Sequence, residues 1–121
     1  MKKVLIVDDS ETIRHQVKRT LDQAGWMTLE ATDGVDGLAQ AELHPDIAIA
    51  LLDVNMPRLN GLDMLAQLRE NPKIAAIPVL MLTTEAEPAL TERAKKLGAK
   101  GWIVKPVTPQ LLVSAVAKLA R

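Results

Sequence analysis

The chain of 121 residues has no cysteine, tyrosine or phenylalanine, and only two tryptophans. Without cysteine, neither disulfide bonds nor thiolate-bound metals are available, which fits a cytoplasmic protein. Without a series of aromatic rings, there is no platform on which nucleic-acid bases would stack. The formal net charge is zero, so no overall electrostatic attraction to nucleic acid is expected either.

Long hydrophobic runs are also missing from the sequence. No apolar run approaches the roughly 20 residues that span a membrane, so we expect no membrane contact. The acidic pair Asp8-Asp9 interrupts the first apolar run too early for the core of a signal peptide. Apolar residues make up 48% and charged residues 25% of the chain, which is typical of a globular domain. We therefore expect one domain over residues 1–121.

Short apolar segments alternate with segments of helical periodicity along the whole chain. Residues 3–7, 47–52, 79–82 and 101–104 are continuous apolar runs, which predict strands buried on both faces of a parallel sheet. Residues 26–31 are more mixed in polarity, as expected of an edge strand. The alternation predicts an α/β fold of five βα units, with a doubly wound parallel sheet and helices on both faces.

The helices between these strands are predicted from start and stop signals. Ser10, Asn60 and Thr108 are the predicted N-caps of the first, third and last helices. The second helix follows the turn at Asp33-Gly34, and the fourth is expected to include Ala86, with Pro88 in its first turn. The stop signals are Gly25, Pro45, Asn71-Pro72 and Gly98.

Polar side chains follow four of the predicted strands at the point where each strand ends. They are Asp8-Asp9, Asp53, Thr83-Thr84 and Lys105. Because the carboxyl ends of parallel strands share one edge of a sheet, these groups are predicted to gather there, where ligands of open α/β sheets bind. Three carboxylates suit Mg²⁺, and without a metal they repel one another.

This set of groups also suits phosphoryl transfer. Asp53 is a candidate nucleophile that would form an acyl phosphate. Lys105 and Thr83 would each bind one phosphoryl oxygen, and the metal would bind the third. Each residue alone is more often a turn former, a helix cap or a surface residue. Together, complementary groups at four strand ends are hard to explain as caps.

The motifs resemble the receiver domain of response regulators in two-component signalling, over nearly the whole chain. The resemblance rests on residues 4–10, residues 52–57, Asn60-Gly61-Leu62, Thr83 and Lys105-Pro106, in this order. Any one of these motifs is weak evidence, but the five in order are specific. The length resembles the single-domain chemotaxis type.

The resemblance implies a flavodoxin-like fold with strand order 2-1-3-4-5. It makes Asp53 the phosphoacceptor, and it implies a Mg²⁺ site formed by Asp8, Asp9, Asp53 and the backbone carbonyl of Asn55. It also implies a cis peptide bond before Pro106. The phosphoryl group would come from a sensor histidine kinase. The domain would catalyse only its own phosphorylation and dephosphorylation, so it would not be an enzyme with a separate substrate.

The resemblance also implies a switch and an output face. Thr83 would couple to the aromatic position of the last strand, which holds Trp102 here instead of the commoner Tyr or Phe. The alternative is an edge-strand aromatic that packs on the last helix. Asn55 and Glu85 would tune the access of attacking water and give a phosphoryl lifetime of seconds to minutes. A target protein would bind the last strand and the last two helices, with a phosphatase as a further partner; we expect a monomer.

Other interpretations remain open from the sequence. A metal-dependent phosphohydrolase of the haloacid-dehalogenase type would need a second acid where Ser10 stands, and would need a cap insertion. A degenerate receiver would act only as a non-phosphorylated interaction module. The chain could also be a receiver domain cut from a longer response regulator. A role in chemotaxis or motility rests on the length and on the pair Asn55 and Glu85.

Overall fold

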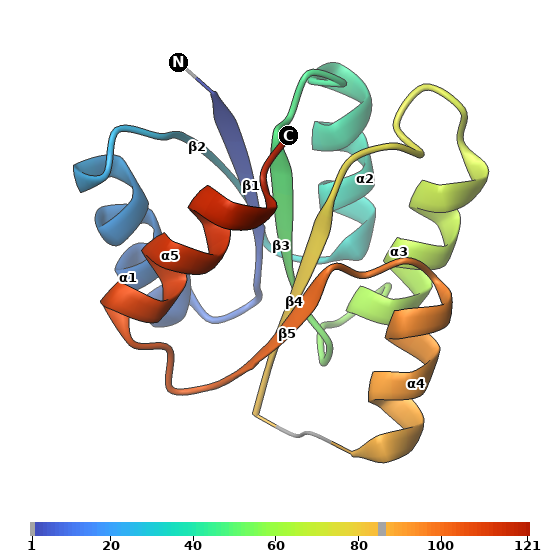
Figure 1. Cartoon of the computed structure of the whole chain (residues 1–121). Coiled ribbons are helices and arrows are strands. Elements are labelled where there is room, and N and C mark those ends of the chain that lie inside the picture. The colour runs from blue at the N-terminus through green and yellow to red at the C-terminus, as the bar shows by residue number, and fades with distance from the viewer. Residues whose placement is uncertain (1, 85–86) are drawn as a thin grey trace.

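The computed structural model describes residues 2–84 and 87–121. Its centre is a five-stranded parallel sheet with the order β2-β1-β3-β4-β5 (Figure 1). The strands are β1 (Lys3–Val7), β2 (Met27–Ala31), β3 (Ile49–Asp53), β4 (Val79–Thr83) and β5 (Gly101–Val104). The helices are α1 (Glu11–Gln23), α2 (Gly34–Leu43), α3 (Gly61–Glu70), α4 (Pro88–Lys96) and α5 (Pro109–Leu119). The predicted fold and strand order are confirmed.

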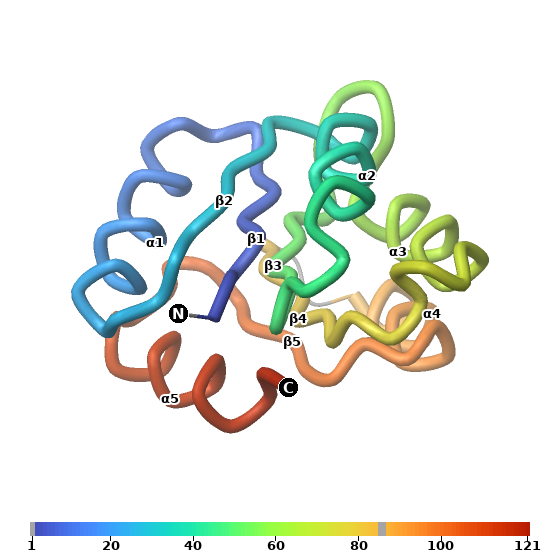
Figure 2. Tube along the Cα trace, turned by 90° about the horizontal axis from the view of Figure 1, so that it is seen from above, coloured from blue at the N-terminus to red at the C-terminus, as the bar shows by residue number. Residues whose placement is uncertain are grey.

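Helices cover both faces of the sheet and give the molecule two hydrophobic cores. In Figure 2, α1 and α5 lie on one face, and α2, α3 and α4 lie on the other. Successive strand residues point to opposite faces. In β1, Leu5 and Val7 therefore join the core under α2, α3 and α4, while Val4 and Ile6 join the core under α1 and α5. The central strands are buried on both sides, which explains their continuous apolar sequence.

Most helix ends follow the predicted signals. The Ser10 hydroxyl accepts a hydrogen bond from the Ile13 amide, and the Asn60 side chain accepts one from the Asp63 amide. Gly25 and Gly98 follow α1 and α4 with φ angles of 94° and 81°, a conformation that side chains with a Cβ disfavour.

Three local predictions need comment. Thr108 is the N-cap of α5, but its side chain makes no capping hydrogen bond; Pro109 begins the helix with a φ that suits the first turn. β3 begins at Ile49, because the Ile47 amide instead donates to the His44 carbonyl in the turn after α2. Ala86, which we expected in the fourth helix, lies outside the described residues. Among the residues described, no helix is long and apolar enough to cross a membrane.

Candidate functional site

The carboxyl ends of β1 and β3 bring three acidic side chains together. Asp8 and Asp9 follow β1, and Asp53 is the last residue of β3. The two strands are in register at Val7 and Leu52, so both end at the same level. Each acid offers an oxygen within 4.8 Å of the others, with Asp8 and Asp53 buried and Asp9 exposed. This cluster of hard oxygen ligands fits Mg²⁺, which needs few protein carboxylates and keeps several waters.

Lys105 places a buried ammonium group between two of these carboxylates. Its Nζ lies 2.6 Å from Asp8 Oδ2 and 3.2 Å from Asp53 Oδ1. The Lys105 amide donates to the Thr83 carbonyl at 2.6 Å, and the following peptide bond to Pro106 is cis. The side chain is only 9% exposed, so the ion pairs are poorly screened by solvent. One cation thus offsets part of the repulsion among the acids.

The raised pKa of Asp53 indicates that Lys105 offsets the repulsion among the acids only in part. Burial raises the pKa of the Asp53 carboxyl, and the neighbouring Asp8 anion raises it further, while Lys105 lowers it. The raised pKa means that the charged form of Asp53 is disfavoured in the folded protein. A divalent cation bound to the acids would remove this penalty. The electrostatics of the site therefore favour a bound metal.

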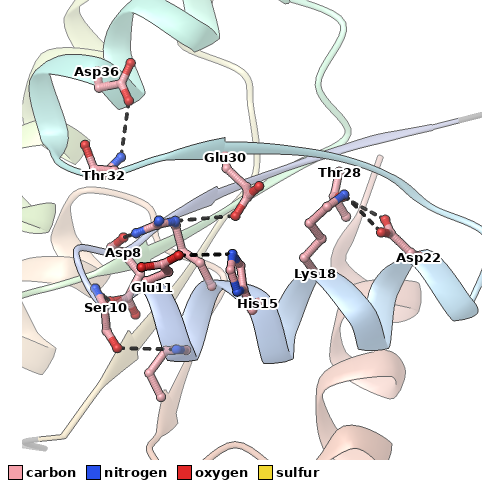
Figure 3. Close-up of polar contacts among 12 residues, drawn as sticks. Asp8, Ser10, Glu11, His15, Lys18, Asp22, Thr28, Glu30, Thr32 and Asp36 are labelled. Atoms are coloured by element: carbon pink, nitrogen blue, oxygen red, sulfur yellow. Dashed lines mark hydrogen bonds and ion pairs between the residues drawn. The ribbon is translucent and has the colours of Figure 1, made fainter.

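Asp8 is held by its neighbours from several sides. The Ser10 amide donates to Asp8 Oδ1 at 2.9 Å, and Arg14 Nη1 donates to the Asp8 carbonyl at 2.8 Å. Arg14 Nε also lies 3.4 Å from Glu30 Oε1. Figure 3 draws this ion pair between Glu30 of β2 and α1 as a dashed line. Arg14 was not predicted as a site residue, because a charged residue on an amphipathic helix gives no signal that distinguishes it from a solvated one.

A pocket opens beside the acidic cluster. It is lined by Asp8, Asp9, Ser10, Ile13, Asp53, Asn55, Thr84, Lys105 and Pro106. Asn55 and Lys105 therefore lie beside the acidic cluster. Thr83 is fully buried at the end of β4, and its neighbour Thr84 lines the pocket. Glu85 lies outside the described residues.

A close backbone contact fixes the start of α3 against the end of β3. The Gly61 amide donates to the Val54 carbonyl at 2.9 Å. A Cβ atom on Gly61 would overlap the carbonyl oxygen of Asp53. Only glycine permits this approach, so Gly61 helps to set the position of Asp53. Gly61 belongs to the motif Asn60-Gly61-Leu62, but nothing in the sequence indicates this backbone contact.

Trp102 lies on the opposite side of the sheet from the last helix. It is half-buried and packs on the core that contains Ala94 of α4, and it lines a small pocket with Thr91 and Lys95. The core that contains Leu112 of α5 does not include it. Trp102 is thus an aromatic of an edge strand, as the alternative interpretation has it, but the predicted packing on the last helix is wrong. Alternation along β5 directs Trp102 and Ile103 to opposite faces.

Comparison with known proteins identifies the family. Residues 4–117 match the response regulator receiver domain. The chain belongs to this family. Chemotaxis protein CheY1 of Helicobacter pylori (strain ATCC 700392 / 26695) is 40% identical to this receiver domain over 111 residues, which are 91% of this chain and 90% of the relative. The family excludes the phosphohydrolase interpretation.

Solved structures agree with the fold of this receiver domain. Chemotaxis protein CheY4 of Vibrio cholerae, crystallised at low pH, has a TM-score of 0.92 and 39% identity over 98% of each chain. A CheX-CheY-BeF3-Mg²⁺ complex from Borrelia burgdorferi has a TM-score of 0.90 and 29% identity, covering 97% of this chain and 87% of that one. The receiver domain is thus of the CheY type, a signalling module rather than a classical enzyme. Receiver domains bind Mg²⁺ at an acidic pocket, and the cluster of Asp8, Asp9 and Asp53 has that composition.

Proposed function

We propose that this receiver domain accepts a phosphoryl group on Asp53 from a sensor histidine kinase and relays the signal by protein–protein interaction in chemotaxis or motility. The observation that carries the proposal is the position of Asp53. Its carboxylate ends a central strand, borders an open pocket, and lies between two further acids and a buried ammonium group. A carboxylate in such a setting has both the access and the charge compensation that phosphoryl transfer needs.

The chemistry divides among the pocket residues. An Asp53 oxygen attacks the phosphorus of the phosphohistidine, the P–N bond breaks, and the imidazole leaves with the bonding electrons. Asp8, Asp9, Asp53 and the Asn55 carbonyl would hold Mg²⁺, which neutralises charge on the incoming phosphoryl group when it is bound. Lys105 exchanges its contact with Asp53 Oδ1 for a phosphoryl oxygen.

The same site would control the output of the signal. The Thr83 hydroxyl binds a phosphoryl oxygen and couples to Trp102, which packs under α4. Val104 of β5 and Leu111 of α5 are exposed large hydrophobic residues on the face proposed for the target protein. Asn55 would tune hydrolysis of the acyl phosphate, and Glu85 is predicted to do the same. We propose a cytoplasmic monomer that a phosphatase also recognises.

The test is intact mass after incubation with Mg²⁺ and acetyl phosphate. The protein should gain one labile phosphoryl group, and Asp53→Asn should gain none. Asp46→Asn is the matched control, because Asp46 is an exposed acid paired with Lys3 near the amino ends of the strands. No gain from acetyl phosphate or from a phosphorylated kinase would overturn the proposal in favour of a non-phosphorylated interaction module.

A further inference from the structure

The loop between β3 and α3 is tied to the turn between β2 and α2 by two consecutive residues. Arg58 Nε donates to Asp33 Oδ2 at 2.7 Å. The next residue, Leu59, accepts a hydrogen bond at its carbonyl from the Gly34 amide at 3.0 Å. Because β3 and β2 are separated by β1 in the sheet, these contacts join two loops across the carboxyl end of β1.

Asp33 is a firm anchor for this contact. Its side chain is only 7% exposed, and its other oxygen, Oδ1, accepts the Asp36 amide at 2.8 Å as the N-cap of α2. The hydrogen bond from Arg58 and, to a smaller extent, the one from the Asp36 amide hold the pKa of the Asp33 carboxyl below its usual range. The bond from the Asp36 amide therefore orients the Asp33 carboxylate independently of the loop that carries Arg58.

Arg58 holds an uncommon backbone conformation for that contact. Its φ angle is +63°, and within residues 2–84 and 87–121 it is the only non-glycine residue with a positive φ. Such a conformation is disfavoured for a residue with a Cβ and persists when the surroundings hold it in place. The Arg58 side chain is 60% exposed and forms the ion pair with Asp33.

We propose that Arg58 is a positioning residue for the metal site. Its ion pair with Asp33 holds residues 54–60 in the conformation that presents Asn55 to Mg²⁺. This inference rests on the proposed function, because it assumes that Mg²⁺ binds beside Asp53. Asn55 lies three residues before Arg58 and lines the pocket, so a loss of order at Arg58 reaches it through a short segment of loop.

The direction of the change in Mg²⁺ affinity distinguishes a positioning role of Arg58 from a purely electrostatic one. Removing Arg58 removes a positive charge from the end of the sheet that would bind Mg²⁺, and electrostatics alone would then tighten Mg²⁺ binding. Loss of loop order would weaken it. Arg58→Ala therefore gives opposite results under the two explanations, and weaker binding supports the positioning role.

The experiment is calorimetric titration of the full chain with Mg²⁺. The ion pair has one exposed partner, so Arg58→Ala should weaken binding by about two- to fivefold. Asp33→Asn keeps the helix cap, since Asn caps as well as Asp, and should give a similar loss. The double variant should be no weaker than either single variant, because both remove the same contact. Arg58→Lys should restore part of the affinity, and Asp46→Asn is the distant control.

Two results would overturn the inference. The first is an Arg58→Ala variant that matches the wild type or binds Mg²⁺ more tightly. The second is full affinity in Arg58→Gly, which relieves the backbone at a positive φ but has no ion pair. Thermal unfolding without Mg²⁺ verifies that each variant is folded. If the wild type itself fails to bind Mg²⁺, the proposed function fails before the role of Arg58 is tested.

Discussion

Substitution of Gly61 by alanine should disturb the phosphorylation site through a single atom. The added Cβ would overlap the Asp53 carbonyl oxygen. That oxygen belongs to the backbone of a central strand, so it has no flexible side chain to move away. Either α3 or the end of β3 has to shift, and a shift of β3 moves Asp53.

The free energy of unfolding should fall by about 2 kcal/mol in this variant. Overpacking against a rigid neighbour costs about 3 kcal/mol, the upper part of the usual range. Replacing glycine returns about 0.5–1 kcal/mol through the lower entropy of the unfolded chain. For 121 residues, the entropy of unfolding is about 0.25 kcal/mol per degree, so the melting temperature should fall by about 8 °C.

The assay combines thermal unfolding with the rate of phosphorylation by acetyl phosphate. Gly25→Ala is the matched control: Gly25 has a φ of 94°, a Cβ added to it would meet no atom within 4 Å, and it follows α1, away from the pocket. It should lose stability through its backbone conformation alone, by about 1–2 kcal/mol, and should keep its phosphorylation rate. The reasoning is refuted if Gly61→Ala melts within about 2 °C of the wild type and is phosphorylated at the same rate.

Three further predictions concern charged residues. Asp53→Asn should be more stable than the wild type at pH 7 without Mg²⁺, by more than about 0.5 kcal/mol, because the raised pKa of Asp53 makes its ionised form oppose folding. In the wild type, protonated Asp53 stabilises the folded state fully below its unfolded pKa of about 4, and this stabilisation is lost as the pH rises through the folded pKa. The extra stability of Asp53→Asn over the wild type, measured by urea unfolding, should therefore shrink as the pH falls toward about 4. Lys105→Met leaves two buried carboxylates without their shared cation, so saturating Mg²⁺ should raise its melting temperature more than that of the wild type; an equal rise would contradict this. Arg69→Met should cost about 3 kcal/mol in chemical unfolding, because the Arg69 guanidinium donates to four backbone carbonyls around the ends of α3 and α4, and a loss below about 1 kcal/mol would contradict this expectation.

The sheet and the main site groups were predictable because their signals are local. The apolar run of residues 3–7 ends at Asp8-Asp9, and the run before Asp53 ends in the same way. Once the strands are taken as parallel, their ends must meet at one edge. The fold therefore needed only short patterns and a rule about parallel sheets, and the register at Val7 and Leu52 agrees with both.

The contacts that support the site were not predictable in this way. Arg58 and Asp33 are 25 residues apart, and no periodicity connects a loop arginine to a distant helix cap. Arg14 resembles any charged residue on a helix. The side of the sheet on which Trp102 packs depends on the strand register, where a shift of one residue reverses the face. These features depend on tertiary packing, which cannot be predicted from a short stretch of sequence.

The two tryptophans report separately on the two halves of the interior. Trp26 packs on the core beneath α1 and α5, and Trp102 packs on the core beneath α2, α3 and α4. With no tyrosine or phenylalanine in the chain, ultraviolet emission comes from these two indole rings alone. A variant that keeps only one tryptophan has a single fluorophore, and its emission reports on the core at one face of the sheet. Because β1, β3 and β4 contribute side chains to both cores, both signals should be lost in a single transition during unfolding.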